Sequence, residues 1–570
     1  MPADGNHHGA ASERTLADLF ATDGGIYLGL TVKGGTDQRR PLAGKEDDPT
    51  VLRRELLGTT WLHDGGYFLY QGEGHIGIWG PQGSGKSRKV MLPNILRLKN
   101  WSKIIIDIKG ELTAATALYL KQSGHGVHVI DPFRVIEKEY PRLYAFDPAL
   151  FKSVGHNHVA ALDPLEDRFP DDADGLAMAA IPKDDGLAAY WSSAGQALTA
   201  GALMALRLER PGVSDSLEAF SEMMAQEPED LAKYIKLLVR TYGDKFPAIR
   251  ANLSEFASFR PEDREIGAIR RTVKVATKWL NSPLIRADCR QRNCVDFASF
   301  KERPQTCFII LPPGETTQKA TWLRLMINSA LQPQLRSTSV PPVPVLFMID
   351  EIGALGNMEF LSSNINLLRG HGVKLMTIWQ FVSQVRTTYK QSWEAIMGAC
   401  DVKLTFTSSE PETLEYFSRL SGERLYTHAQ YSRATNTSTS RGTSRQDGGN
   451  SQWGQPFGGT SWGGGTSFNF SESETDTTSS TLQKEPRVWP GELQGLDRDE
   501  AVCFSRRGRI DRTILPQPHI LPGIERVLAA LRPLMIDKPS TAIPARTIYL
   551  GPASDPAPHR RPDPDQPPAP

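Results

Sequence analysis

The sequence predicts an α/β fold, in which a largely parallel sheet is surrounded by helices and interrupted by a helical insertion. Six short apolar, β-branched runs alternate with helix-like segments, which is typical of strands buried on both faces of a parallel sheet. The runs are residues 75–79, 103–108, 127–130, 307–311, 345–349 and 373–378. The stretch from 166 to 300 lacks such runs and reads as helices joined by polar breaks, which predicts an all-α part.

The charge balance of the chain hides a local asymmetry. The 570 residues include 65 Lys and Arg against 65 Asp and Glu, which excludes a globally basic nucleic-acid coat and an acidic solvating polymer. Residues 151–230 carry 5 basic and 15 acidic side chains, whereas residues 231–306 carry 16 basic and 8 acidic ones. The zero net charge of the chain therefore results from the cancellation of unlike segments, and it is compatible with a local basic surface.

The cysteines and the hydrophobic segments indicate a cytoplasmic protein. The five cysteines are scattered, which favours a reducing compartment, and Cys289 and Cys294 lack the second pair of ligands that a zinc site needs. The N-terminus has no signal-peptide pattern. The longest uncharged stretch, 186–206, contains Ser, Thr and Gln, so we interpret it as a buried helix and predict no transmembrane helix.

Residues 80–87, GPQGSGKS, fit the phosphate-binding pattern G-x-x-x-x-G-K-[ST] in full. The pattern lies between a predicted strand and a predicted helix, which is the context that a phosphate-binding loop needs. Glycines let backbone N–H groups turn toward phosphate oxygens, Lys86 neutralises the β- and γ-phosphates, and the Ser87 hydroxyl is a ligand for Mg²⁺. The predicted nucleotide-binding residues are Gly80, Gln82, Gly83, Ser84, Gly85, Lys86 and Ser87.

A second motif is the apolar strand 345–349, which ends in Asp350 and Glu351. Asp350 is predicted to hold Mg²⁺ together with Ser87, and Glu351 to polarise the attacking water as general base. Two acids after a strand also fit the N-cap of a helix, but beside a complete phosphate loop they predict an ATPase whose cofactors are ATP and Mg²⁺. Gln380 follows the next apolar strand and is expected either to contact the γ-phosphate or its water, or to cap the strand end.

More than 250 residues separate the two motifs, so a domain is inserted between them. Residues 431–480 include 35 Ser, Thr, Gly, Asn or Gln and no Val, Ile, Leu or Met, a composition that predicts disorder. The predicted organisation is a disordered N-terminus (1–24), a nucleotide-binding domain in two parts (25–165 and 301–427), an inserted all-α domain (166–300), a low-complexity disordered insertion (428–485), a C-terminal hairpin and helix (486–535) and a Pro-rich tail (536–570).

Several blocks, in order along the chain, resemble the coupling-protein ATPases of type IV secretion and conjugation, the TraG-like group. The blocks are GPQGSGKS, DIKGE (107–111), IDPF (130–133), ALDPL (161–165), YWSSA (190–194), FIILPPGE, LFMIDEIGALGNM, LLRGHGVKLMTIWQFVSQ and ACDVKLTFTSSEPETLEYFSRLSG. The resemblance covers roughly residues 75–425, with a weaker match near 485–515. So many ordered blocks are more specific than a phosphate loop alone.

The resemblance implies a RecA-like P-loop motor with an inserted all-α domain, assembled as a hexameric ring at the bacterial inner membrane. Such motors receive a relaxase bound to single-stranded DNA, or effector proteins, and deliver them to the secretion channel at the expense of ATP. The implied partners are other copies of the chain, these substrates, and the ATPases and inner-membrane components of the channel. Many family members begin with transmembrane helices that anchor the ring, and the sequence predicts none here, so we expect either that the anchor is a separate protein or that this is a soluble member, with a cytoplasmic location at the periphery of the inner membrane.

The resemblance also implies roles for single residues. Lys86 and Ser87 bind phosphate and Mg²⁺, Asp350 and Glu351 handle metal and water, and Gln380 matches the family's glutamine. Arg369 matches a basic residue that resembles an arginine finger reaching the neighbour's ATP; capping its own helix is the alternative. Asp107, Lys109 and Glu111 match the family's D-P-K-G-E block, with Ile108 in place of Pro, and are expected to support the site.

Two other functions stay open at this point. One is a DNA-translocating ATPase of the FtsK/HerA type, and the other is a substrate-docking adaptor that binds nucleotide and hardly hydrolyses it. The order of the blocks favours the coupling motor over the first, and the intact Lys86, Asp350 and Glu351 favour it over the second. The sequence does not distinguish DNA from protein as the cargo.

Overall fold

The computed structural model describes most of the chain. The described residues are 25–31, 61–64, 67–183, 186, 188–213, 215–258, 260, 263–291, 294–316, 318–336, 341–444, 465–506 and 508–535. The predictions of a disordered N-terminus (1–24) and of a Pro-rich tail (536–570) lie outside these residues.

A twelve-stranded mixed sheet organises the described chain, in the order β2-β3-β1-β14-β13-β10-β4-β9-β8-β5-β7-β6. The strands from β10 to β6 in this order run parallel to one another. They are β10 (Cys400–Thr405), β4 (His75–Trp79), β9 (Val373–Trp379), β8 (Val345–Ile349), β5 (Ser102–Asp107), β7 (Gln305–Ile310) and β6 (Gly126–Ile130). The α/β prediction is confirmed, and each of the six predicted runs forms a strand.

The remainder of the sheet is antiparallel and comes from the two ends of the chain. β13 (Glu500–Ser505) and β14 (Ile510–Ile514) form the predicted hairpin, and β13 also pairs with β10. β1 (Ile26–Thr31) joins β14 to β3 (Tyr67–Tyr70), and β2 (Trp61–Asp64) pairs with β3. The C-terminal hairpin thus lies beside the parallel core, where β10 separates it from β4, the strand that leads into the phosphate loop.

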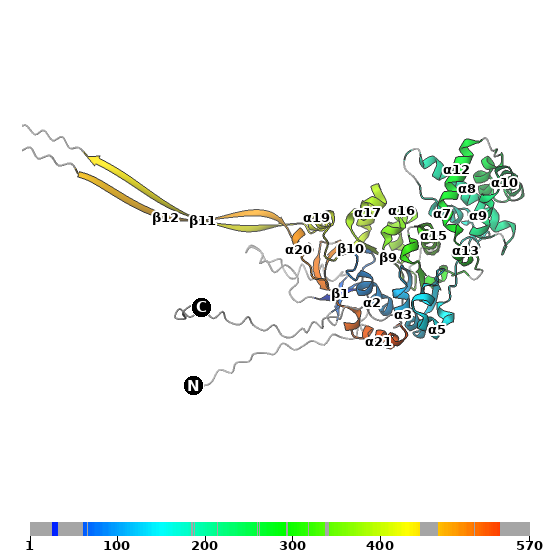
Figure 1. Cartoon of the computed structure of the whole chain (residues 1–570), viewed down its shortest axis with the longest axis horizontal. Helices are drawn as coiled ribbons and strands as arrows, with labels where there is room; N and C mark the ends of the chain where they lie inside the picture. Colours follow the sequence, from blue (N-terminus) through cyan, green and yellow to red (C-terminus); the bar gives the residue numbers. More distant parts are fainter. Residues whose placement is uncertain are drawn as a thin grey trace, which may run out of the picture.

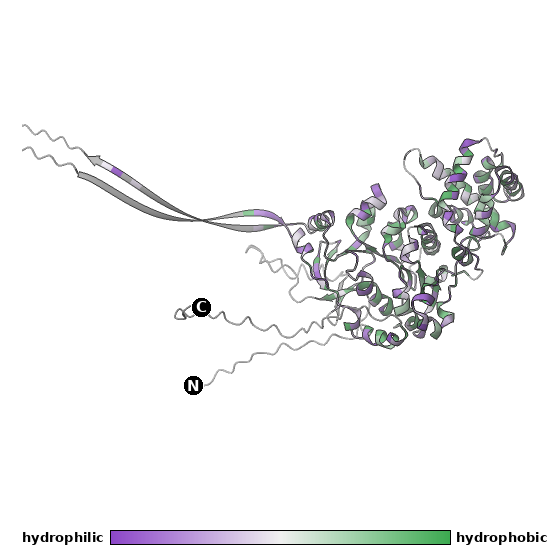
Figure 2. Cartoon of the chain, in the orientation of Figure 1, coloured by the Kyte–Doolittle hydropathy of each residue, from purple (hydrophilic) through white to green (hydrophobic). Residues whose placement is uncertain are grey.

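Helices cover both faces of the sheet, because successive strand residues point to opposite faces. Ile105 belongs to one hydrophobic core, whereas Ile104 and Ile106 belong to the other. The first core includes α2 (Leu92–Arg97), α3 (Glu111–Gln122) and α21 (Ile524–Met535); the second includes α15 (Ala320–Leu331), α16 (Glu359–Leu368) and α17 (Val382–Tyr389). Figure 2 shows hydrophobic and hydrophilic residues alternating along these helices, as amphipathic helices require.

Shorter helices complete the body. They are α4 (Val135–Glu139), α5 (Pro141–Phe146), α6 (Pro148–Phe151), α14 (Pro313–Thr316), α18 (Trp393–Ala399), α19 (Pro411–Leu420) and α20 (Pro490–Gln494). Several of them begin with proline at the first turn, where a missing N–H costs no hydrogen bond.

Between β6 and β7 the described residues form helices and no strand. The longer ones are α7 (Phe169–Ala180), α8 (Ala188–Glu209), α9 (Leu217–Ala225), α10 (Pro228–Tyr242), α11 (Pro247–Leu253), α12 (Arg264–Ala276) and α13 (Pro283–Cys289). They gather at one end of the molecule, where α7 packs against α15 and α16 (Figure 1). Among the described helices, none is long and apolar enough to cross a membrane.

A long two-stranded ribbon projects from the opposite end of the body (Figure 1). β11 (Glu423–Ser444) pairs antiparallel with β12 (Gly465–Pro486), from Glu423 opposite Pro486 to Ser444 opposite Gly465. The prediction of disorder over 428–485 is therefore wrong for the described parts of this segment; residues 445–464 lie outside them. A ribbon pairs its backbone groups between strands without burying an apolar face, so the scarcity of apolar residues does not prevent it, and repeated Thr favours extended backbone.

Candidate nucleotide-binding site

The phosphate loop joins the carboxyl end of β4 to a helical segment. Gly83 and Gly85 have φ angles of +82° and +84°, a region that side chains disfavour, so glycine is required at both positions. Gly80 is also restricted, because a Cβ there would lie 2.9 Å from the Cβ of Phe406. The segment begins with a π-helical turn (η2, Ser87–Met91) and continues as α2. The predicted glycines therefore lie where the backbone needs them.

Lys86 folds back into this loop. Its Nζ donates hydrogen bonds to the carbonyl oxygens of Gly80 (2.6 Å) and Pro81 (2.8 Å). Burial lowers the pKa of Lys86 to about 8, against the opposing effect of Asp350 and Glu351. The ammonium group is therefore held over the loop by neutral carbonyls, and phosphate oxygens would be stronger acceptors for it.

Ser87 and Asp350 meet although 263 positions separate them. Ser87 Oγ donates a hydrogen bond of 2.8 Å to Asp350 Oδ2. Asp350 directly follows β8, and its burial raises the pKa of its carboxyl group, while the Ser87 hydroxyl and Lys86 lower it. A hydroxyl beside a carboxylate offers the hard oxygen ligands that Mg²⁺ prefers.

Glu351 and Gln380 form a second contact across neighbouring strands. Gln380 Nε2 donates a hydrogen bond of 2.6 Å to Glu351 Oε1. Glu351 has a φ of +60°, which is uncommon outside glycine and is found at functional sites. The backbone N–H of Gln380 is itself bound by Gln384 Oε1, at 3.0 Å. The Gln380 amide therefore holds the Glu351 carboxylate, a contact that the sequence did not predict.

Asp107, from the DIKGE block, ends β5 in the same pocket. Its Oδ2 accepts hydrogen bonds from the backbone N–H and the hydroxyl of Thr113, both at 2.8 Å. Burial raises the pKa of Asp107 to about 6, against the lowering effect of these bonds. Lys109 and Glu111 also line the pocket, so the block contributes to its wall.

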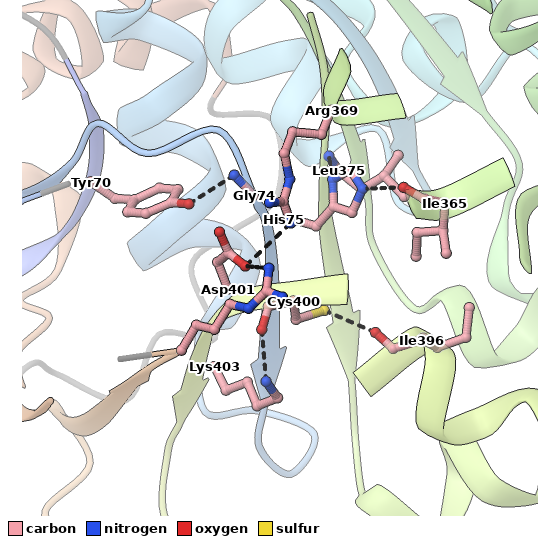
Figure 3. Close-up of polar contacts among 11 residues, drawn as sticks. Tyr70, Gly74, His75, Ile365, Arg369, Leu375, Ile396, Cys400, Asp401 and Lys403 are labelled. Carbon is pink, nitrogen blue, oxygen red and sulfur yellow. Dashed lines mark hydrogen bonds and ion pairs between the residues drawn. The ribbon is translucent and has the colours of Figure 1, made fainter. Parts of the chain in front are cut away.

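Arg369 lies at the other edge of the sheet. It ends α16 just before the amino end of β9, whereas Gln380 follows the carboxyl end of that strand. A seven-residue strand separates the two residues by about 20 Å. Arg369 Nη2 instead approaches Asp401 Oδ1 at 3.4 Å (Figure 3). Of the predicted catalytic residues, the structure brings together Lys86, Glu351 and Gln380, and not Arg369.

Residues near the C-terminus complete the pocket and were not predicted. The pocket has a volume of about 270 Å³, and Arg498 and Gln517 line it together with the phosphate loop. The buried Lys89 of η2 connects these parts: its Nζ donates to the Arg498 carbonyl oxygen and pairs with Asp499 Oδ1, both at 2.7 Å. No local pattern marks Arg498 or Gln517, because they are scattered polar residues far along the chain from the loop.

The residues present fit a magnesium nucleotide. The loop offers a lysine and a backbone that only glycine can adopt, and Ser87 with Asp350 offers oxygen ligands at its side. By contrast, His, Cys, Asp and Glu nowhere gather in groups of three that could hold a metal ion within the described ranges. The predicted position of ATP and Mg²⁺ therefore agrees with the chemistry of the side chains.

Comparisons with known proteins identify the family of the chain. A family model described as type IV secretory system conjugative DNA transfer matches residues 38–451. The conjugal transfer protein TraG of Escherichia coli is 24% identical over 381 residues, which cover 62% of this chain and 56% of that protein. Protein VirD4 of Rhizobium rhizogenes is 25% identical over 381 residues, which cover 65% and 52%. The chain thus spans about half the length of the curated relatives it matches.

Solved structures show the same fold. The plasmid coupling protein TrwB in complex with the non-hydrolysable ATP analogue ADPNP superposes with a TM-score of 0.56 at 15% identity, over 85% of this chain and 96% of TrwB. An unbound form of TrwB lacking its N-terminal 70 residues gives 0.54 at 15% identity, over 78% and 85%. The RecA-like P-loop fold predicted for the core is thereby confirmed.

Proposed function

This chain belongs to the family of type IV secretory system conjugative DNA transfer proteins, and from this premise we propose that it is an ATP-driven coupling motor. It recruits relaxase-bound single-stranded DNA or protein substrates and delivers them to the secretion channel. The observation that carries the proposal is the convergence of Lys86, Ser87–Asp350 and Glu351–Gln380 in one pocket. A protein that only docks substrates has no need of a carboxylate held beside a phosphate loop.

Each residue has one task in this proposal. Bound with Mg²⁺, ATP supplies the phosphoanhydride whose hydrolysis drives transport. Lys86 neutralises the terminal phosphates, Ser87 and Asp350 hold the metal, and Glu351 accepts the proton of the attacking water. Gln380 keeps the Glu351 carboxylate oriented through its 2.6 Å hydrogen bond, and it can report the state of that carboxylate to β9.

The position of Arg369 supports an assembly of several copies. Since Arg369 is one strand length from the phosphate loop of its own chain, it can assist hydrolysis only in a neighbouring copy. A contact between the amino edge of one sheet and the carboxyl edge of the next is head-to-tail, and such contacts form a ring when the rotation between copies closes. We propose a hexameric ring beside the channel at the inner membrane, with the helices of 166–300 as an inserted domain.

The two other functions are less well supported. The family match and the names of the relatives concern conjugative transfer, which favours it over a pump of the FtsK/HerA type. A docking adaptor with little hydrolysis has no use for Gln380 holding Glu351. DNA and protein cargo both remain compatible with the proposed motor.

An ATPase assay of the full chain, with and without single-stranded DNA and across protein concentration, tests the proposed function. We expect turnover per chain to rise steeply with protein concentration, because a site completed by its neighbour works only after assembly. Single-stranded DNA should stimulate turnover further if it is the cargo. Bound nucleotide without turnover at any concentration would favour the adaptor, and turnover that is independent of concentration would contradict the shared site.

Arg498 should contribute to nucleotide affinity. Its carbonyl oxygen accepts a hydrogen bond from Lys89, two residues after Ser87, and Arg498 lines the same pocket as the phosphate loop. We expect Arg498→Ala to weaken the binding of a fluorescent ATP analogue about tenfold, the effect of one hydrogen bond between a cation and an acceptor. Arg512→Ala, on β14 of the same hairpin, is the matched control and should bind normally. Equal affinities of the two variants would remove Arg498 from the site.

A further inference from the structure

The segment that directly follows Glu351 is a single helical turn, η7 (Ile352–Leu355), with a positive φ angle on either side. Glu351 before the turn has a φ of +60°, and Gly356 after it has a φ of +70°. Glycine adopts such an angle readily, but for Glu351 it costs free energy, so surrounding contacts must hold the turn in place. The contacts of η7 therefore determine how the backbone of Glu351 is held.

One of these contacts leads back to the Glu351 carboxylate. A Cβ on Gly353 would lie 2.1 Å from Gln384 Nε2, so the Gln384 amide rests directly on the backbone of η7. The oxygen of the same amide accepts a hydrogen bond of 3.0 Å from the Gln380 N–H, and the Gln380 side chain binds the Glu351 carboxylate at 2.6 Å. The turn and the carboxylate are therefore connected through two glutamines as well as along the chain.

Arg324 of α15 holds the other end of the turn. Its Nη1 donates a hydrogen bond of 2.9 Å to the carbonyl oxygen of Leu355, the last residue of η7. Its Nε donates to the Ala179 carbonyl oxygen at 3.3 Å, and its Nη2 donates to the Thr321 hydroxyl at 2.7 Å. One guanidinium group thus joins η7 to α7, the helix that contains Ala179.

The side-chain hydrogen bonds of Arg324 within the described residues go to neutral oxygens rather than to a carboxylate. Burial lowers the pKa of its guanidinium group to about 10, because a buried cation loses contact with water. The planar guanidinium group has N–H donors in several fixed directions, which lets it bind oxygens of different elements at once. Its burial is therefore compensated by the oxygens of η7, of α7 and of its own helix.

The end of α7 is connected in turn to the helices at the far end of the molecule (Figure 1). Ala179 lies in the last turn of α7, where carbonyl groups lack partners within the helix, and the positive charge of Arg324 lies at the negative end of the helix dipole. Just beyond α7, the Ile181 carbonyl oxygen accepts a hydrogen bond of 2.7 Å from Gln196 Nε2 of α8. Because α8 packs against α7, α9, α10, α11 and α12, a displacement of the end of α7 reaches all of these helices.

We propose that Arg324 is a positioning residue that couples the nucleotide pocket to the helices between β6 and β7. The inference rests on the proposed function, since it requires nucleotide to bind beside Glu351. A shift of the Glu351 carboxylate on nucleotide binding moves η7 through Gln380 and Gln384, and Arg324 passes this movement to the end of α7. Coupling between two sites is reciprocal, so a substrate bound to these helices acts back on the position of Glu351.

Hydrogen–deuterium exchange of the full chain measures this coupling, in Mg²⁺ with and without a non-hydrolysable ATP analogue. In wild type we expect the analogue to slow exchange in the phosphate loop and to change it in the last turn of α7 and in α8. In Arg324→Met, which keeps the length of the side chain without its donors, the loop should respond as in wild type. The nucleotide-dependent change in α7 and α8 should fall about tenfold, the effect of one hydrogen bond from a charged donor. Loss of the helix cap alone would speed exchange in α7 equally with and without the analogue.

Arg336→Gln is the matched control. Arg336 follows η6 (Gln332–Leu335), directly after α15, and pairs with Asp172 of α7. It therefore also joins α7 to the body, but its partner is a carboxylate of α7 rather than a carbonyl of η7. We expect this variant to keep the nucleotide-dependent change in α7 and α8, and Arg324→Lys to recover part of it. Thermal unfolding checks that each variant is folded.

Gly353→Ala interrupts the same connection at a second point, and it tests the proposal even if Arg324→Met does not fold. The added methyl group would displace the flexible end of Gln384 and so separate it from the Gln380 N–H. We expect the phosphate loop of this variant to respond to the analogue, and α7 and α8 to lose their response. A full response of α7 and α8 in folded Gly353→Ala would contradict the proposed connection.

The remaining outcomes are also decisive. A nucleotide-dependent change in α7 and α8 of Arg324→Met equal to that of wild type would overturn the proposal. So would an equal loss in Arg336→Gln, since the effect would then belong to the docking of α7 in general. Wild type in which the analogue protects the phosphate loop and leaves α7 and α8 unchanged would remove the coupling and leave the proposed function standing. Wild type in which the analogue protects neither region would overturn both.

Discussion

Replacing Lys86 with Ala should abolish measurable nucleotide binding and, with it, ATP turnover. Lys86 is 8% exposed, and it is the single cationic residue within the phosphate loop, residues 80–87. Two charge-assisted contacts to phosphate, each worth about 1.5 to 3 kcal/mol, correspond to an affinity loss of roughly two to four orders of magnitude. The measurement is equilibrium titration of a fluorescent ATP analogue in the presence of Mg²⁺.

Removal of Lys86 must be distinguished from damage to the loop. In the structure the side chain also bridges Gly80 and Pro81 through their carbonyl oxygens, so Lys86→Ala leaves both without this donor. Thermal unfolding of the variant therefore accompanies the titration. Lys121→Ala, an exposed lysine of α3 paired with Asp147, is the control that should bind normally. An affinity of the folded Lys86→Ala variant within threefold of wild type would contradict the assignment of the loop.

Replacing Glu351 with Gln should separate binding from hydrolysis. The glutamine amide can still accept the hydrogen bond from Gln380 Nε2, and it keeps the size and position of the carboxylate. It cannot accept the proton of the attacking water. General-base catalysis contributes about a hundredfold or more, so turnover should fall by at least that factor while the affinity for ATP stays near that of wild type.

A single-turnover experiment, in which enzyme exceeds ATP, measures this effect directly because product release does not limit it. Glu359→Gln, at the start of α16, is the matched control for loss of a carboxylate and should hydrolyse ATP normally. Hydrolysis by Glu351→Gln within threefold of wild type would remove Glu351 as the base. It would then leave Gln380 holding a carboxylate with a purely structural role.

The core of the site could be predicted from sequence because its residues mark the ends of strands. The loop follows β4, Asp350 and Glu351 follow β8, and Gln380 follows β9. Since these strands are parallel, their carboxyl ends share one edge of the sheet, and residues 263 positions apart meet there as Ser87 and Asp350 do. The position of each motif at the end of a strand was therefore enough to predict where it lies in the fold.

The C-terminal part of the site could not be predicted in this way. Arg498 reaches the pocket because β13 pairs with β10 and Lys89 binds the turn before β13. Neither pairing leaves a local pattern, since a buried lysine and an exposed arginine look like ordinary surface residues in sequence. The prediction of disorder for the ribbon failed for a different reason. The composition of the segment indicates that it cannot bury an apolar core, but it does not indicate whether the backbone of one strand pairs with that of another.

The sequence by itself determined the α/β class, the phosphate loop and the acids opposite it, because strand periodicity and glycine placement are local properties of the chain. The tertiary structure alone decided that Gln380 holds Glu351 and that Arg498 borders the pocket. It also decided that Arg369 shares Asp401 with Arg506 at the far edge of the sheet. These contacts follow from the order in which strands lie side by side, and that order is set by packing over long sequence separations.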